Sequence, residues 1–440
     1  MSTGDRKRVL VVANPFPPMA SGGNARIVRF CRHLPDHGWE PVVLTARASG
    51  PVPVPEDLQV VRAAAPTPAA AYALARRADA AVRAARTSRR AGGPAPACRP
   101  AGDHPVTGGP PGGPAGTRST SRQKRFNDWL FVPDTYVGWI LPALRAGKRL
   151  LAEQHFDAVF SSYPRGSAQL VAAELARVGG LPWLADYRDP WTTGSERRFA
   201  SAAHKRTHAA LEEHTLRWAA QVTAVNAAIL ADLLHAYPFL QARGEVISNG
   251  FDPDEPADEV DLGDGFWFVH TGRLYQRMGE VSRFLQALAA LPDDVHVLFL
   301  GVEGSQVRAE AERLGIGHRV RVEPFAAHSH ALGCQRAADA LLLITLAEAE
   351  SLTGKVFEYL ASGKPVFAIT PPGSAAQQLL QRAGASAWAE PQAAMTEPVG
   401  RFVSAVRDGG LPVRDLAVVA ECDAGSLTAR LAALLDGMAG

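Results

Sequence analysis

The sequence predicts two α/β domains, each a doubly wound parallel sheet of Rossmann-like topology. Short apolar runs such as Val9–Ala13 and Ala340–Ile344 are typical of strands buried on both faces of a sheet. Stretches with helical spacing of apolar residues lie between such runs, so strand and helix alternate along most of the chain. The chain has 440 residues, more than one ordinary domain, and the alternation restarts after about residue 265. We therefore expect two sheets whose carboxyl edges face one cleft.

The first domain, residues 1–250, opens with the strand Val9–Ala13 and a loop rich in Pro and Gly. A helix is expected from Asn24 to His37, because apolar residues recur there at helical spacing and Gly38 follows. Further strands are expected at 41–45, 60–61, 158–161, 182–185, 221–225 and 245–248. Further helices are expected at 69–90, 138–154, 167–178 and 202–219, and after Asn226.

Residues 251–265 are acidic and contain Pro and Gly, which predicts a linker before the second domain, 266–415. Strands are expected there at 266–270, 295–300, 319–322, 339–344 and 365–369. Helices are expected at 279–290, 305–314, 329–337, 354–362 and 374–383. The remaining residues, 416–440, are expected to form a helical segment that packs back on the first domain.

Residues 91–117 interrupt the pattern, since Gly or Pro occupies 15 of these 27 positions. We expect a disordered insertion, because such a stretch buries too little apolar surface to offset the entropy of ordering it. The chain has a formal net charge of +2, yet twelve Lys or Arg stand against two Asp between Arg62 and Arg125. This basic stretch is interpreted as a solvated helix end or as a peripheral contact with an anionic membrane. A nucleic-acid partner is not expected, because no aromatic platform accompanies the charge.

The four cysteines have neither metal-like nor disulfide-like spacing and are interpreted as thiols in a reducing compartment. No apolar run reaches the roughly 18 residues that span a bilayer, and Val9–Ala13 is too short for a signal peptide. We therefore expect a cytoplasmic protein, either free or peripheral at the inner face of the cell membrane.

Residues 350–369 carry the clearest chemical signal. A loop with Glu350 follows an expected strand, and a helix then begins near Thr353, Gly354 and Lys355. Backbone N–H groups at a helix N-terminus, together with a lysine, suit a diphosphate. Glu350 and Glu358 then provide acceptors for hydroxyls on either side, which favours a nucleotide sugar as ligand. The alternative is two solvated glutamates around an ordinary helix start.

This Glu-x7-Glu pattern, followed by Gly363–Val366, resembles the family 4 retaining glycosyltransferases. The likeness covers most of the chain except the insertion, and it implies the GT-B architecture of two Rossmann-like domains that face a cleft. In that family the first glutamate contacts the donor hexose and the second the ribose, which implies these roles for Glu350 and Glu358. The family usually has Gly three residues after the first Glu, where this chain has Thr353 followed by Gly354.

A second element, Gly272-Arg273-Leu274, follows the first strand of the second domain. Arg273 is expected to face the cleft and to stabilise charge on a leaving diphosphate, the alternative being a surface arginine in a turn. The family has a Lys-Gly after this element, whereas Met278 stands at the Lys position beside Arg277. The second phosphate cation is then Arg277 or Lys355, and we favour Lys355.

In the first domain, Gly22 and Gly23 resemble the paired glycines that border the donor phosphate in this family. Asp186, Arg188 and Asp189 lie in an Asp-x-Arg-Asp-Pro-Trp sequence, which resembles a branch associated with polysaccharide assembly. Many family members place a His near this point, and this chain has none there. The three residues are candidate catalytic groups, with Asp186 or Asp189 orienting the acceptor hydroxyl. An internal Arg–Asp salt bridge is an equal alternative.

The expected helix 202–219 carries three histidines and two glutamates, which raises the question of zinc: His204, His208, Glu212, Glu213 and His214. Because no His-Glu-x-x-His is present, we interpret them as solvated helix residues and expect no metal site.

The sequence thus predicts a retaining hexosyltransferase with a nucleoside-diphosphate sugar as donor substrate. No cofactor or metal is expected, since protein cations take the place of a metal. The expected acceptor is a hydroxyl of a glycan, a lipid-linked molecule or a small molecule. Two alternatives remain: a nucleotide-sugar epimerase of similar fold, and a catalytically silent nucleotide-sugar-binding partner of another transferase.

Overall fold

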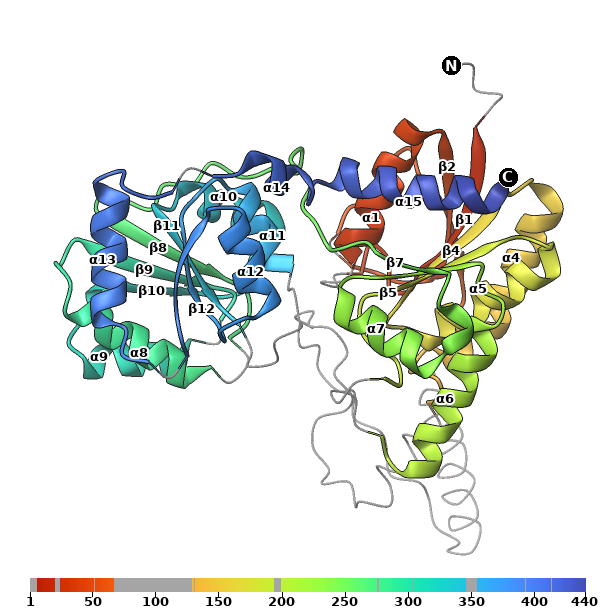
Figure 1. Ribbon diagram of the computed structural model, residues 1–440, viewed down its shortest axis with the longest axis horizontal. Coiled ribbons are helices and arrows are strands. Elements are labelled where there is room, and N and C mark those ends of the chain that lie inside the picture. The colour runs from red at the N-terminus through yellow and green to blue at the C-terminus, as the bar shows by residue number, and fades with distance from the viewer. Residues whose placement is uncertain are drawn as a thin grey trace, which may run out of the picture. The chain divides into compact units, whose positions relative to one another are not determined.

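The computed structural model describes residues 6–19, 24–50, 52–66, 129, 131–193, 199–274, 277–302, 304–345, 354–391, 393–412 and 414–440. The chain divides into two compact units (Figure 1). The first unit comprises residues up to 224, with 229–245 and 432–440. The second unit comprises residues 225–228 and 246–431.

The first unit contains a sheet of seven described strands in the order β3-β2-β1-β4-β5-β6-β7. The strands are β1 (Lys7–Val12), β2 (Trp39–Ala46), β3 (Gln59–Ala63), β4 (Ala158–Tyr163), β5 (Trp183–Tyr187), β6 (Gln221–Ala224) and β7 (Gly244–Val246). The described helices are α1 (Asn24–His33), α4 (Ile140–Glu153), α5 (Gly166–Gly179), α6 (Ala202–Leu216) and α7 (Ala227–Ala236). The pairs from β3 through β6 are parallel, which confirms the predicted doubly wound sheet.

The second unit contains a parallel sheet of six described strands in the order β10-β9-β8-β11-β12-β13. The strands are β8 (Phe266–Thr271), β9 (Val295–Leu300), β10 (Val320–Glu323), β11 (Ala340–Ile344), β12 (Val366–Ile369) and β13 (Ser386–Ala389). The described helices before β13 are α8 (Met278–Ala289), α9 (Ser305–Arg313), α10 (His328–Ala337), α11 (Gly354–Ala361) and α12 (Ala375–Arg382). After β13 follow α13 (Thr396–Arg407), α14 (Leu416–Ala420) and α15 (Ala424–Ala439).

In the buried strands of the second sheet, alternate side chains pack on opposite faces of the sheet. On β11, Ala340, Leu342 and Ile344 belong to a core cluster with residues of α8, α9 and α13. Leu341 and Leu343 belong to a second cluster with residues of α10, α11 and α12. Apolar side chains are therefore needed at every position of the strand, which explains the continuous apolar runs in the sequence.

The first helix is shorter than predicted. It ends at His33, and residues 34–37 form a 3-10 helix. Pro35 lacks the backbone N–H that an α-helical hydrogen bond requires, so the α-helix cannot continue through it. Gly38 then ends the segment with a φ of +82°, and its N–H donates to the Leu34 and Pro35 carbonyls.

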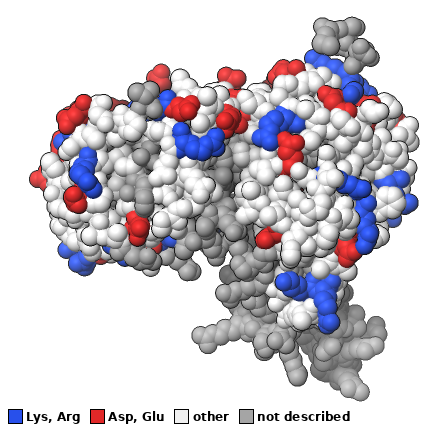
Figure 2. Space-filling model, viewed as in Figure 1, with Lys and Arg blue, Asp and Glu red and all other residues white. Residues whose placement is uncertain are grey.

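None of the described helices is long and apolar enough to cross a bilayer. On the face shown in Figure 2, described Lys and Arg side chains alternate with Asp and Glu and do not form one basic patch. The insertion 91–117, the expected helix 69–90 and most of the basic stretch between Arg62 and Arg125 lie outside the described residues.

Candidate functional site

The strand order of the second sheet reverses between β8 and β11. The chain proceeds from β8 to β9 and β10 on one side, and from β11 to β12 and β13 on the other. In open parallel sheets such a switch point leaves a crevice beyond the carboxyl ends of the two central strands, where ligands bind. Here Gly272 and Arg273 follow β8, and Thr345 follows β11.

A turn after β8 brings Lys355 to this edge of the sheet. Gly272 has a φ of +86°, and its N–H donates to the Leu300 carbonyl at 2.7 Å. A Cβ at Gly272 would lie 2.7 Å from Lys355 Cε, so the end of the lysine lies against this backbone and would have to move for any other residue. Lys355 Nζ donates to the Arg273 carbonyl at 3.2 Å. The ammonium group is therefore held at the carboxyl end of β8.

Lys355 also belongs to the first turn of α11, which begins at Gly354. Two sources of positive potential meet here, the ammonium group and the backbone N–H groups at the N-terminus of the helix. Burial lowers the pKa of Lys355 to about 8, although Glu358 partly offsets this effect. A bound anion would stabilise the ammonium form, so this arrangement suits a diphosphate.

Glu358 lies one turn further along α11 and is held by a buried polar network. The Gln335 amide, on α10, donates to Thr271 Oγ1 at 3.0 Å and to Glu358 Oε2 at 3.3 Å. The Tyr359 hydroxyl accepts from the Thr271 N–H at 3.0 Å. These bonds connect the end of β8 to α10 and α11, so the carboxylate has a fixed position at the switch point. Gln335 and Tyr359 could not be predicted from the sequence, because each contacts Thr271, which is distant in sequence.

A pocket of about 260 Å³ in the second unit includes Glu358 in its wall. Its other polar lining comes from Asp252, Glu255 and Ser362, and from Gln335 and Arg336 on α10. A carboxylate accepts several hydrogen bonds, so Glu358 can bind hydroxyl groups while it accepts from Gln335. The pocket thus offers acceptors suited to hydroxyl groups, along α11 from Glu358 to the C-terminal end of the helix.

His270 connects β8 to β11 beneath this site. Its ring is fully buried, and Nδ1–H donates to the Leu342 carbonyl at 2.9 Å. Burial, and then the nearby Lys355 ammonium, lower the pKa of His270 to about 3. The imidazole is therefore neutral at physiological pH and adds no charge to the site. Sequence reasoning assigned no role to this residue.

The two candidate arginines differ in their surroundings. Arg273 is exposed at the end of β8, where its carbonyl accepts from Lys355. Arg277 directly precedes α8, and its guanidinium lies 3.9 Å from the Glu280 carboxylate with only 11% of its side chain exposed. Among the described cations, Arg273 and Lys355 are therefore better placed than Arg277 to receive a phosphate.

Four predicted site residues lie outside the described residues: Gly22, Gly23, Glu350 and Thr353. The described chain ends at Thr345 after β11 and resumes at Gly354, the first residue of α11. The roles expected for these four residues stay predictions.

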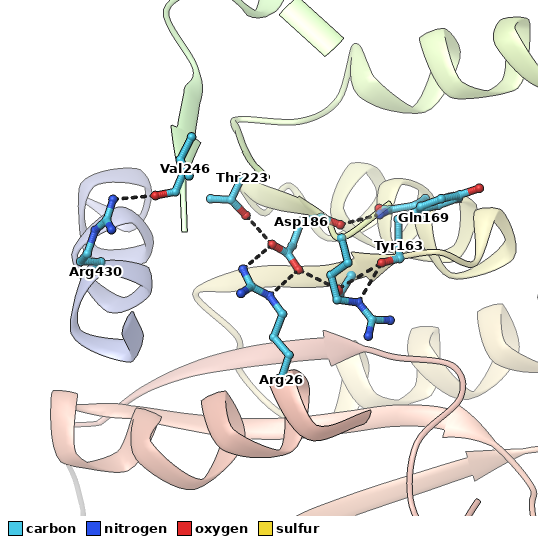
Figure 3. A network of polar contacts seen from close by, with 9 residues as sticks. Arg26, Tyr163, Gln169, Asp186, Thr223, Val246 and Arg430 are labelled. Atoms are coloured by element: carbon cyan, nitrogen blue, oxygen red, sulfur yellow. Dashed lines mark hydrogen bonds and ion pairs between the residues drawn. The ribbon is translucent and has the colours of Figure 1, made fainter. Parts of the chain in front are cut away.

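Asp186, at the end of β5, is fully buried in the first unit. Figure 3 shows its contacts with Arg26 and Thr223. Arg26 of α1 binds both of its carboxylate oxygens, at 2.8 and 3.1 Å. Ser162 and Thr223 donate to the same carboxylate at 2.7 and 2.9 Å. Burial alone would raise the pKa of Asp186, but Arg26 and the two hydroxyls outweigh it, so the pKa lies below its usual range. This geometry favours the internal salt bridge, with Arg26 as the cation, over a catalytic role.

The other two residues of this loop lie nearer the surface. Arg188 Nε donates to the Tyr163 carbonyl at 2.9 Å, so the guanidinium lies across the ends of β4 and β5. Asp189 is exposed. Of the three predicted catalytic residues in the first unit, Asp189 is therefore the one most accessible to an acceptor.

The interpretation of the α6 cluster as solvated is wrong for three of its members. His204, His208 and Glu212 are buried, with 6%, 1% and 0% of their surface exposed, because this face of α6 packs into the first unit. His214 is exposed and Glu213 is half-buried. Among the described residues, no group of three His, Cys, Asp or Glu has the geometry of a metal site.

Comparison with known families gives a match in each half of the chain. Residues 103–255 match the model described as Glycosyltransferase Family 4, and residues 265–436 match the model described as Glycosyl transferases group 1. No curated protein matches the chain.

Several solved structures share the fold. Anabaena Alr3699/HepE in complex with UDP is 14% identical with a TM-score of 0.60, over 98% of this chain and 100% of that one. Sucrose-phosphate synthase from Thermosynechococcus elongatus is 15% identical with a TM-score of 0.55, over 98% and 94% of the two chains. A glycosyltransferase from Rickettsia africae is 13% identical with a TM-score of 0.54, over 97% of each chain. These likenesses confirm the predicted GT-B fold.

Proposed function

Because the chain belongs to the glycosyltransferases that these two family models describe, we propose that it moves a hexose from a nucleoside-diphosphate sugar to an acceptor hydroxyl with retention of configuration. The observation that carries this proposal is the packing of Lys355 against the Gly272 turn at the switch point of the second sheet. The second unit binds the donor in this account, and the first unit binds the acceptor. The acceptor is a glycan, a lipid-linked molecule or a small molecule.

The reaction breaks the bond between the anomeric carbon of the donor and the diphosphate oxygen. Negative charge then develops on the departing diphosphate, where Lys355, Arg273 and the N-terminus of α11 stabilise it. These cations take the place that a metal ion has in other transferases. The acceptor oxygen forms the new bond to the anomeric carbon, and its proton passes to the departing diphosphate.

The two glutamates have separate roles in this proposal. Glu358 accepts the ribose hydroxyls in the pocket that it lines with Gln335. Glu350 orients the hexose so that its anomeric carbon meets the acceptor, as the family resemblance implies. Ribose binding and hexose orientation can therefore be tested by separate substitutions.

A donor screen tests the proposal. Alr3699/HepE has been crystallised with UDP-glucose and with UDP and glucose, so UDP-glucose is the first probe in a panel of nucleotide sugars. We expect release of the nucleoside diphosphate that depends on an added glycan or lipid-linked acceptor. Conversion of the donor sugar without any acceptor would instead indicate an epimerase. Donor binding without turnover, unless a partner transferase is added, would indicate a silent binding subunit.

Replacing Lys355 with methionine should weaken binding of the nucleoside diphosphate by about 10- to 100-fold. Hydrogen bonds to charged groups contribute about 1.5–3 kcal/mol, and methionine retains the apolar stem without the ammonium group. Calorimetric titration with UDP measures the effect, and Lys364→Met at the amino end of β12 is the matched control. Equal affinity in Lys355→Met and the wild type would contradict the assigned phosphate site.

The affinity for a nucleotide sugar should decrease as the pH rises from 7 to 9.5. Only the ammonium form of Lys355 attracts the diphosphate. The pKa of Lys355 is about 8 when no diphosphate is bound. Bound diphosphate raises that pKa, so binding takes up a proton above pH 8 and weakens by up to about tenfold per pH unit. Titrations in buffers of different ionisation enthalpy measure this proton uptake. A pH-independent affinity, or the same dependence in Lys355→Met, would rule out this cause.

A further inference from the structure

The loop after β5 is held against α6 by two buried side-chain contacts. Trp191 Nε1 donates to His208 Nδ1 at 3.0 Å, and the Thr192 hydroxyl donates to Glu212 Oε2. Trp191 is fully buried, and Thr192 is 6% exposed. His208 and Glu212 are four residues apart on α6, so they form one anchoring face for the loop. The same loop carries Arg188 and Asp189, the candidate residues on the acceptor side.

Glu212 lies in surroundings that favour its uncharged form. It is fully buried, and among the described residues it takes part in no ion pair. Tyr237 donates to Oε2 at 3.1 Å, alongside Thr192. Oε1 has no hydrogen-bond partner, and the Tyr187 hydroxyl, also buried without one, faces the same carboxyl group. The Tyr187 hydroxyl can donate to Oε1 of the carboxylate and can accept from Oε1 of the protonated acid.

Among the residues that the structure describes, the groups that face Glu212 do not supply a counter-charge. Tyr187 comes from β5, Thr192 from the loop and Tyr237 from the segment after α7. On α6 itself, His208 accepts from Trp191, and Glu213 is negative and pairs with Arg217 at the surface. Burial raises the pKa of Glu212 to about 7, although the hydrogen bonds from its neighbours lower it in part. Ionisation would place a negative charge in the core of the first unit that no described cation compensates.

We propose that Glu212 is a positioning residue that anchors loop 188–193 in its carboxylic-acid form, so that ionisation of Glu212 loosens the loop and slows sugar transfer without altering donor binding. The kinetic part rests on the proposed function, in which the first unit binds the acceptor. The anchoring part is a property of the fold and is measurable without any substrate.

The first test compares the stability of the wild type and Glu212→Gln across pH. Glutamine mimics the neutral acid and does not titrate. A free glutamate titrates near pH 4.3, as in the unfolded chain, whereas folded Glu212 titrates near pH 7. The folded state therefore binds the extra proton, and the wild type loses stability relative to Glu212→Gln between these two values. We expect the urea midpoint of Glu212→Gln to rise relative to wild type from pH 5 to pH 7 and then to level off.

The second test measures turnover at saturating donor. Wild-type kcat should be roughly tenfold lower at pH 8 than at pH 6 if only the protonated form anchors the loop. The ratio of Glu212→Gln to wild-type kcat should rise by the same factor, while the affinity for UDP stays equal in both proteins at each pH. The matched control is Glu213→Gln, which removes a neighbouring carboxylate whose partner is Arg217 at the surface. The ratio of Glu213→Gln to wild-type kcat should not change with pH.

A second variant covers the case in which Glu212→Gln does not fold. Tyr237→Phe removes one donor to Oε2 and should move the alkaline decrease in kcat to higher pH, because the ionised form loses a hydrogen bond. The proposal would be overturned if the stability difference between Glu212→Gln and the wild type does not vary with pH. It would also be overturned if the alkaline decrease in kcat moves to lower pH in Tyr237→Phe. A pH-dependent stability difference with a constant kcat ratio would overturn the kinetic part. If the wild-type protein transfers no sugar, the proposed function is contradicted. The stability test would then still decide whether Glu212 anchors the loop in its carboxylic-acid form.

Discussion

Replacing Glu350 with alanine should lower sugar transfer by about 100- to 1,000-fold, with nucleoside-diphosphate affinity within about threefold of wild type. The family resemblance implies that this residue contacts the transferred hexose and not the nucleotide. Loss of that contact removes orientation at the reacting carbon, whereas Lys355, Arg273 and Glu358 still bind the nucleotide. Initial rates at saturating donor, together with calorimetric titration of UDP, separate the two effects.

Two further variants make this test specific. Glu348→Ala removes a carboxylate two residues before Glu350, outside the Glu-x7-Glu pattern, and it should retain wild-type transfer. Glu358→Ala should mainly weaken nucleotide affinity, because the Glu358 carboxylate lines the pocket assigned to ribose. Full turnover by Glu350→Ala would show that the hexose is oriented by another residue.

Replacing Asp186 with alanine should lower the free energy of unfolding by about 3–5 kcal/mol. The loss follows because the buried Arg26 guanidinium would lose the Asp186 carboxylate, and Ser162 and Thr223 would lose their acceptor. Urea unfolding at neutral pH, followed by tryptophan fluorescence, measures the change. The fraction of Asp186→Ala that remains folded should transfer sugar at the wild-type rate.

A double variant separates a structural role of Asp186 from a catalytic one. Arg26→Met with Asp186→Leu removes both charges together and should recover most of the lost stability, since apolar residues of similar volume often replace buried ion pairs without cost. An Asp186→Ala protein with wild-type stability and no transfer would instead make Asp186 catalytic.

The sequence predicted the fold because local signals were sufficient for it. Continuous apolar runs such as Ala340–Ile344 are needed wherever a parallel strand is buried on both faces, and helical spacing marked the segments between them. Several local features were missed, among them the helix α13. Pro35 ends α1 early, and β13, Ser386–Ala389, is only four residues long and lacks β-branched residues.

The candidate site was predictable only in part, since its geometry depends on long-range contacts. Lys355 was found from its place at a helix start, but its packing against Gly272 joins residues distant in sequence. Arg26 lies 160 residues from Asp186, so the cation of the buried ion pair could not be identified from the Asp-x-Arg-Asp-Pro-Trp sequence alone. The burial of His208 and Glu212 likewise depends on which face of α6 meets the rest of the first unit.

A crystal structure of the full chain with a bound nucleoside diphosphate sugar tests the central claim most directly. The account predicts the diphosphate at the carboxyl ends of β8 and β11, with an oxygen within hydrogen-bonding distance of Lys355 Nζ and the Gly354 N–H and with the ribose against Glu358. A nucleotide bound elsewhere in the chain, with Lys355 still bonded to the Arg273 carbonyl and no phosphate beside Gly272, would contradict it.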